Sequence, residues 1–297
     1  MLLQPNLERK EAIMRRGKQD RTMLIKGIPK NKMLIHEKQL SDSVKNVWKK
    51  MKSILRKVVD GDSWHTAIRA SVKEAGQNAI IPEITKAEVD KIVEIVSKSY
   101  GREIAGLVTI HLNNLLDSVN LQIARQLRLP NRTAEYTRIK NEIMERHFKI
   151  VSTQVTETMA TDLKNVLTEG ITSGLSSSEI IANMNMLEGN HRTIARTEVG
   201  SAVNEASFEM TKAEMEHLGM TGITKKGWTT ANDEKVRDSH QQAGEDYGEG
   251  KEIPIDQPFI VGGKAIMFPG EYAADAPEET INCRCTHYIT FSPSVQA

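Results

Sequence analysis

Two cysteines and a histidine close together near the C-terminus are the residues whose types and spacing could bind a metal ion. Cys283, Cys285 and His287 alternate along a segment, 281–291, that has the composition of a strand. Because strand side chains point to alternate faces, the three would lie on one face. His240 is the expected donor from outside this strand. Zinc takes thiolate and imidazole ligands tetrahedrally, so these four residues indicate a zinc site.

A second interpretation of the same residues needs no metal. Cysteine is among the most buried residue types, and a nearby histidine can simply donate a hydrogen bond to a carbonyl. The chain has only two cysteines, so no second pair supports the C-x-C signal. A Cys283–Cys285 disulfide is disfavoured because their Cα atoms would be about 6.6 Å apart in a strand. A cofactor-free core and a zinc site therefore both remain open.

A third group could serve acid–base chemistry. Asp233, Arg237 and His240 fall at i, i+4 and i+7, which predicts one helical face with an Asp233–Arg237 ion pair. In an enzyme, His240 would be the general base and Asp233 would orient it. The chain has no G-x-S-x-G, Walker A or G-x-G-x-x-G pattern to accompany them. We therefore expect a structural polar network without catalysis, and keep a metal-dependent hydrolase or nuclease as the alternative.

Charge is distributed unevenly along the chain. Residues 1–57 hold 16 Lys and Arg against 5 Asp and Glu, whereas residues 228–297 hold 5 against 12. Apolar residues recur every three or four positions from Leu40 to Val58, which predicts an amphipathic helix. Its other face would bind DNA or an acidic protein, or would simply be solvated. The basic residues concerned are Lys45, Lys49, Lys50, Lys52, Arg56 and Lys57.

The remaining pattern predicts the fold. Helical spacing continues to about residue 218, with a break expected near Lys149, and glycines, prolines and short apolar segments follow beyond Gly222. We expect a mainly α protein, with an elongated helical body and a small C-terminal α+β domain. The predicted divisions are a basic arm of weak or partner-dependent structure at 1–35, a helical domain at 36–220 and the α+β domain at 221–297. No apolar run reaches about 18 residues, and two cysteines are no secreted disulfide framework, so we expect synthesis in a reducing cytoplasm.

The order of the motifs resembles one known family. Gly-Leu-Ser-Ser-Ser-Glu-Ile at 174–180 precedes Ile-Ala-Arg-Thr-Glu at 194–198, and Asn-Cys-Arg-Cys closes the series at 282–285. Over roughly residues 150–290 this resembles the phage head morphogenesis, or Mu F-like minor capsid, family. Glu271 departs from the Asp expected after Pro-Gly. The matching positions are Arg196, Thr197, Glu198, Trp228, Asp233, Arg237, His240, Pro269, Gly270, Asn282, Cys283, Arg284 and Cys285.

The resemblance implies a virion protein. Such a protein would associate with the portal vertex, enter the procapsid and lie in the capsid interior, with no membrane in the assembled head. Its expected partners are the portal protein, then scaffolding and major capsid proteins. Double-stranded DNA at packaging or viral genome ejection is a further expected partner. A DNA-binding ejection factor is the alternative that the basic N-terminal segment favours.

Overall fold

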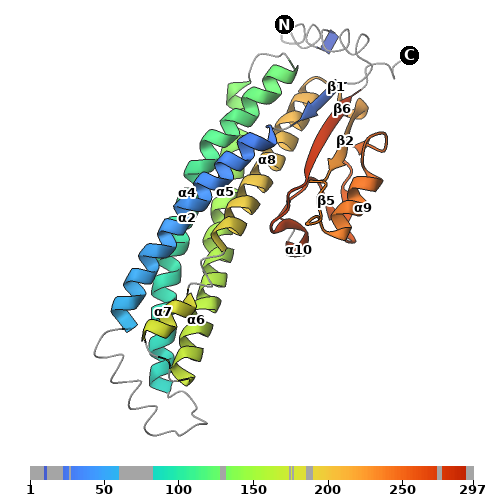
Figure 1. Ribbon diagram of the computed structural model, residues 1–297. Coiled ribbons are helices and arrows are strands. Elements are labelled where there is room, and N and C mark those ends of the chain that lie inside the picture. The colour runs from blue at the N-terminus through green and yellow to red at the C-terminus, as the bar shows by residue number, and fades with distance from the viewer. Residues whose placement is uncertain are drawn as a thin grey trace. The chain divides into compact units, whose positions relative to one another are not determined.

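The computed structural model describes residues 10–11, 23–26, 28–59, 83–127, 132–173, 175, 177–184, 190–272 and 276–291. Most of the predicted arm, residues 1–35, therefore lies outside the described residues. The predicted mainly α class is confirmed. The longer helices are α2 (Lys30–Val59), α4 (Glu83–Leu127), α5 (Thr133–Ile150), α6 (Thr156–Thr172) and α8 (Asn190–His217), and the short helix α7 (Ser177–Asn183) lies between α6 and α8 in the sequence (Figure 1). None of the helices in these ranges is long and apolar enough to cross a membrane.

Contacts divide the chain into two compact units. One comprises residues 1–37, 111–145 and 196–297, and the other comprises 38–110 and 146–195. Residues 221–297 thus share a unit with most of α8 and with the C-terminal part of α4. The sequence-based limits at residues 35 and 220 stay predictions.

The second unit contains the amphipathic part of α2. Most of its predicted apolar face is buried, as the 0–2% exposure of Leu40, Val44, Trp48 and Leu55 shows, but Ile54 is 46% exposed. In the same unit, a Cβ on Gly101 of α4 would overlap the Thr156 side chain, so glycine permits close helix contact there. The helical spacing of apolar residues therefore predicted the right buried face.

A π-helical turn, η2 (Val151–Val155), joins α5 to α6 without a break. Side-chain hydroxyls bond to the carbonyls of this region: Ser152 Oγ donates to Lys149 O, and Thr156 Oγ1 donates to Ser152 O. Such bonds satisfy carbonyls that a widened turn leaves without a regular partner. The break expected near Lys149 is therefore a local widening of one continuous helix.

The first unit contains a four-stranded antiparallel sheet in the order β1-β6-β2-β3. Its strands are β1 (Met23–Lys26), β6 (Thr286–Phe291), β2 (Thr224–Thr229) and β3 (Ile253–Pro254), and the first three lie side by side in Figure 1. β1 comes from the arm that we expected to be weakly structured. Its pairing with β6 corrects that expectation, because the backbone of Met23–Lys26 finds partners at the sheet edge.

Shorter elements cover the sheet. A hairpin joins β4 (Phe259–Val261) to β5 (Lys264–Ile266) through Gly262 and Gly263, whose φ angles of 57° and 78° fit a two-residue turn of type I′. Two helices, α9 (Asp238–Asp246) and α10 (Pro277–Thr280), complete this part. The hairpin, α9 and both cysteines contribute to one hydrophobic core cluster around Trp228.

Candidate metal centre

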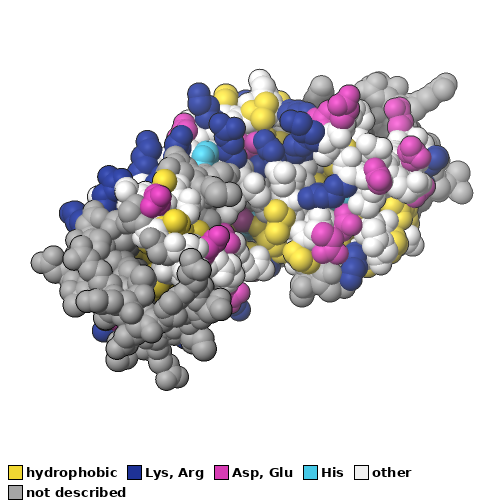
Figure 2. Space-filling view, turned by 60° about the horizontal axis from the view of Figure 1, so that its bottom comes forward, with side chains coloured by type: hydrophobic (Ala, Val, Ile, Leu, Met, Phe, Trp, Pro, Cys, Tyr) yellow, Lys and Arg dark blue, Asp and Glu magenta, His cyan; other side chains and the backbone are white. Residues whose placement is uncertain are grey.

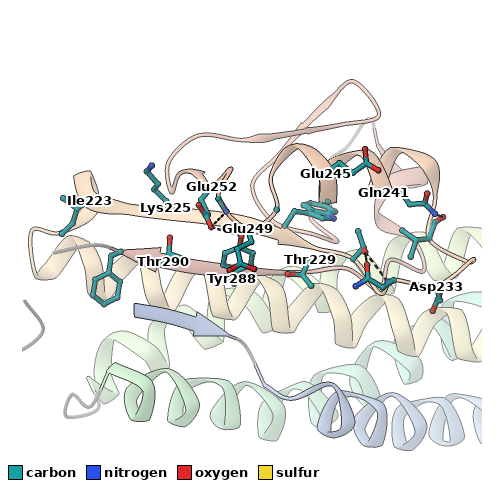
Figure 3. Close-up of a pocket in the computed structure, with 18 of the residues that line it drawn as sticks. Ile223, Lys225, Thr229, Asp233, Gln241, Glu245, Glu249, Glu252, Tyr288 and Thr290 are labelled. Carbon is teal, nitrogen blue, oxygen red and sulfur yellow. Dashed lines mark hydrogen bonds between the residues drawn. The ribbon is translucent and has the colours of Figure 1, made fainter. Parts of the chain in front are cut away.

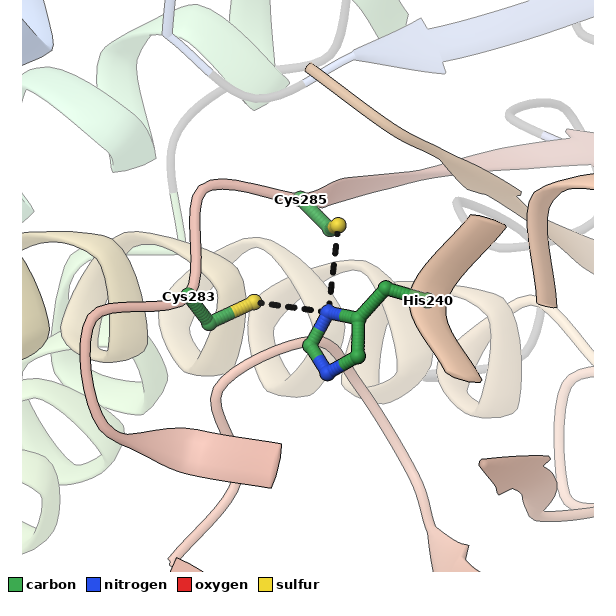
Figure 4. A group of neighbouring side chains, drawn as sticks. All are labelled: His240, Cys283 and Cys285. Atoms are coloured by element: carbon green, nitrogen blue, oxygen red, sulfur yellow. Dashed lines mark hydrogen bonds between the residues drawn. The ribbon is translucent and has the colours of Figure 1, made fainter. Parts of the chain in front are cut away.

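His240, Cys283 and Cys285 meet in the core of the C-terminal part (Figure 4). α9 carries His240, the turn after α10 carries Cys283, and Cys285 immediately precedes β6. Their exposed fractions are 1%, 6% and 4%. The Nδ1 atom of His240 lies 3.3 Å from the sulfur of Cys285 and 3.6 Å from that of Cys283. Three of the four predicted donors are thus brought together.

Glu279 fixes the histidine ring from its other side. Nε2 of His240 lies 2.8 Å from Oε2 of this buried carboxylate, which also accepts a hydrogen bond of 2.8 Å from Ser239 Oγ. Because a carboxylate only accepts, Nε2 carries a proton. The other ring nitrogen, Nδ1, is the atom that faces the two sulfurs. Sequence analysis missed Glu279, which belongs to no motif and follows the helix-starting Pro277.

The two thiols share a proton unequally. A hydrogen bond from Cys285 is the main cause that holds the pKa of Cys283 well below its usual range. Donating that bond, together with burial, raises the pKa of Cys285. The pair therefore favours a thiolate at Cys283, which is the protonation state that a metal ligand requires.

Aromatic rings surround the group. The Trp228 ring stands nearly perpendicular to His240 at 5.5 Å and to Phe259 at 5.3 Å between centroids. Its buried Nε1 has no nitrogen or oxygen partner among the described residues, but it lies near enough to Cys285 to lower the pKa of that thiol. The indole N–H is therefore a donor available to a sulfur.

His287 is not in this group. Its ring packs edge-on against Phe208 of α8, with 6.1 Å between centroids, and neither ring nitrogen has a hydrogen-bond partner among the described residues. Burial lowers its pKa to about 3. The predicted strand was wrong at its start: β6 begins only at Thr286, and Asn282 takes a left-handed φ of 61°. Residues before Thr286 therefore need not follow the alternation on which the prediction depended.

The predicted Asp233–Arg237 helical ion pair is also wrong. α9 begins at Asp238, and Arg237 is extended, with φ −63° and ψ 151°. Asp233 instead accepts both terminal nitrogens of Arg284, a bidentate contact that lowers the pKa of Asp233 to about 2. Arg237 donates to the carbonyl of Ile281. Both residues thus hold the segment that carries the cysteines.

Helix α8 holds that segment from another side. Nη1 of Arg196 donates to Oδ1 of Asn282 at 2.9 Å, and the Thr197 hydroxyl accepts the Asn282 backbone N–H at 2.8 Å. About two turns later, Asn204 Nδ2 donates to the carbonyl of Cys285 at 3.0 Å. Motif residues far apart in sequence therefore converge on residues 282–285.

Two further contacts complete the α8 face. Asn204 Nδ2 also donates to the carbonyl of Pro269 at 2.8 Å, beside Gly270, whose φ is 80°. The Tyr272 hydroxyl donates to Glu198. Tyr272 and the role of Asn204 were missed by sequence analysis. The signal for Asn204 was its position, because it follows Arg196 and Thr197 at helical spacing.

Lys226 was missed as well. It is fully buried in β2, and its Nζ donates to the carbonyl of Met267 at 2.7 Å. The same atom lies 4.7 Å from the ring centroids of both Phe208 and Phe259. Burial lowers the pKa of Lys226 to about 7. Strand alternation with the inward-facing Trp228 was the signal that could have placed it inside.

A separate groove of about 1520 Å³ runs along β2 and β6 (Figure 3). Carboxylates are prominent in its lining, including Asp233, Glu245, Glu249 and Glu252. None of His240, Cys283 and Cys285 lines it. The candidate metal centre is thus not part of this open surface.

The predicted basic surface lies on α2, in the other unit. Lys49, Arg56 and Lys57 are exposed, and Lys45 and Lys52 are half-buried. Lys50 is exposed and pairs with Glu103 at 2.7 Å. Lys and Arg side chains are plentiful on the surface shown in Figure 2. The structure thus presents cationic side chains there, and their DNA or protein partner stays a prediction.

Comparison with known proteins identifies the region that contains the centre. The family described as "Phage Mu protein F like protein" matches residues 161–288. This range includes α8, His240 and the Asn-Cys-Arg-Cys segment. Residues 161–288 are thus similar to the Mu F-like family. The predicted resemblance is confirmed over this range, and the Mu F-like family is one of phage head morphogenesis proteins.

One curated relative has a different kind of name. The chain is 30% identical over 135 residues to the NAD(+)--arginine ADP-ribosyltransferase EFV of Enterococcus faecalis. The aligned segment covers 43% of this chain and 25% of that protein. The chain thus spans about a quarter of the length of this relative. A match of that extent does not establish catalysis here. No solved structure matches the chain.

Proposed function

We propose that this chain is a minor head protein that associates with the portal vertex and enters the procapsid. The Mu F-like match over residues 161–288 carries the proposal. The predicted roles in packaging and ejection follow from the same assignment. A protein of this kind works through binding surfaces, so its motif residues should build a stable unit and need not line a reactive cleft.

The contacts of the motif residues support a structural role. Arg284 is engaged by Asp233, Arg237 by the carbonyl of Ile281, and Asn282 by Arg196 and Thr197. Side chains in mutual bonds of this kind are not available to a substrate without breaking the network. This arrangement favours a head protein over a hydrolase or nuclease.

Copurification with the portal protein tests the proposal. The full chain, coexpressed with the portal of the same phage, should elute with the portal oligomer, and it should be detected by mass spectrometry in procapsids. Major capsid protein expressed alone is the control and should retain much less of the chain. Absence from both portal and procapsid fractions would contradict the proposed role.

A second function, contact with duplex DNA, is favoured by the basic face of α2. Three exposed cations there, Lys49, Arg56 and Lys57, belong to the +11 segment 1–57. Phosphate contacts make DNA affinity fall with salt, with a log–log slope of about −0.9 for each phosphate neutralised. Replacing the three by Gln should therefore reduce that slope by up to about 3.

A matched charge change provides the control for DNA binding. Lys86, Lys91 and Lys98 on α4 are exposed cations, and their replacement by Gln removes the same charge. The control variant should keep the salt slope of the unmodified chain. Equal losses in both variants would show a general charge effect, and no binding at low salt would exclude the DNA-contact role.

A further inference from the structure

We propose that His240, Cys283 and Cys285 bind one zinc ion, through Nδ1 and the two sulfurs, as a structural centre of the Mu F-like region. The site is independent of the proposed portal association. The three donors are buried and lie within 4.8 Å of one another. Zinc is the divalent ion that two thiolates and an imidazole suit best.

The distances agree with a tetrahedral site. With Zn–S of about 2.3 Å and Zn–N of about 2.1 Å, tetrahedral geometry separates nitrogen from sulfur by about 3.6 Å. The two observed Nδ1–Sγ distances are 3.3 and 3.6 Å. Nδ1 points between the two sulfurs in Figure 4, as an imidazole that shares one ion with them must. Small side-chain adjustments would thus accommodate the ion.

Glu279 supplies the support that zinc-bound histidines commonly have. A ligating imidazole usually donates its other N–H to a carboxylate, which fixes the tautomer and makes the ring a better ligand. The 2.8 Å contact between Nε2 and Oε2 is such a bond, and Ser239 holds the same oxygen. The carboxylate in turn lies against Gly262, where a Cβ would overlap it. Glycine at position 262 of the hairpin therefore leaves room for the Glu279 carboxylate.

Donors also surround the sulfurs. The backbone N–H groups of Cys285 and Ala231 lie close to the sulfurs of Cys283 and Cys285, respectively. The Trp228 indole N–H is a third donor near the Cys285 sulfur. N–H groups that face sulfur stabilise thiolates, and two thiolates this close together need a cation between them.

The role we assign is structural because the site is closed and its elements are short. α10 has 4 residues and β3 has 2, so packing area alone stabilises them little. An ion would link α9, the turn after α10 and the start of β6. Three protein ligands leave a fourth position, which water would fill.

Elemental analysis of the full chain, purified under reducing conditions without added metal, tests the site. We expect about one zinc per chain. Cobalt exchanged into the same protein should give the visible bands of a tetrahedral ion and the near-ultraviolet band of thiolate ligation. X-ray absorption should find two sulfurs in the first shell. Removal of zinc by a chelator should lower the Tm by roughly 5–10 °C.

Variants separate ligands from neighbours. Cys283→Ser and Cys285→Ser should lose zinc, whereas His217→Gln, which alters a histidine of α8 outside the group, should keep it. Glu279→Gln should keep the stoichiometry and weaken zinc affinity by about 10–100-fold. If the serine variants do not fold, the cobalt spectrum of the unmodified chain decides.

Three results would overturn the proposal. These are a folded, reduced chain that takes up neither zinc nor cobalt, an ion bound without sulfur ligands, and a Cys283–Cys285 disulfide found by mass spectrometry in freshly purified protein. None of them bears on copurification with the portal. Conversely, zinc binding without copurification with the portal would contradict only the proposed function.

Discussion

The buried lysine of β2 allows a quantitative prediction. Lys226 is fully buried between Phe208 and Phe259, and burial lowers its pKa to about 7 from the ordinary 10.5. The unfolded chain therefore binds more protons than the folded one between pH 7 and 10.5. Stability must rise with pH across that window. Replacing Lys226 by Met keeps the length of the side chain and removes the charge.

The size of the effect follows from the two pKa values. Their difference, about 3.5, corresponds to about 5 kcal/mol at about 1.36 kcal/mol per pKa unit. Two desolvated cation–π contacts would return about 1–2 kcal/mol each to the charged form. Subtracting these contacts from the 5 kcal/mol, we expect the Lys226 contribution to the free energy of unfolding to rise by about 1–3 kcal/mol between pH 7 and 10.

Urea unfolding at several pH values measures this contribution. The stability difference between Lys226→Met and the unmodified chain should favour the variant at pH 7 and shrink toward pH 10. Taking the difference removes the titration of other groups. Lys225→Met, at the exposed neighbouring position, is the matched control and should show little pH-dependent difference. A constant difference for Lys226→Met across this range would refute the assignment of a charged, desolvated lysine.

Three other substitutions test the network around residues 282–285. Asn204→Ala leaves the buried carbonyl of Cys285 without its donor and should cost about 1–3 kcal/mol in urea unfolding. Arg284→Gln should raise the pKa of Asp233 toward its ordinary value, as measured by NMR titration. The stability that the ion pair provides at neutral pH is lost as the pH falls toward 2, so the free energies of unfolding of the variant and the unmodified chain should become equal near that pH. Gly262→Ala forces a side chain into a left-handed φ of 57° and against a carboxylate, so we expect a loss of at least about 1–2 kcal/mol by the same unfolding assay.

The sequence predicted those features of the fold that depend on neighbouring residues in the chain. The spacing of apolar residues located the buried face of α2, because a helix repeats every 3.6 residues wherever it packs. The spacing of apolar residues did not predict β1, because these four residues of a basic segment form a strand by pairing with the edge of β6. The sequence of Met23–Lys26 alone does not indicate that it pairs with β6.

Long-range pairing was the part that the sequence could not decide. Asp233 has a cation four residues away and another 51 residues away, and both would make chemically reasonable partners. Because Arg237 is extended, it does not pair with Asp233. Arg284, in the segment that carries the cysteines, pairs with Asp233 instead. His240 joined the cysteines as predicted, because Cys283, Cys285 and α9 face one core. His287 did not join them, because strand alternation begins after the cysteines.

The position of His240 bears on the enzyme alternative. A general base needs one ring nitrogen within reach of a substrate proton. In His240, Nε2 is taken by Glu279 and Nδ1 faces the two sulfurs, while Trp228 covers the ring. Catalysis by this residue would require the core cluster to open. The same contacts that disqualify His240 as a base make it a well-oriented ligand, so one arrangement argues against acid–base chemistry and for a structural metal.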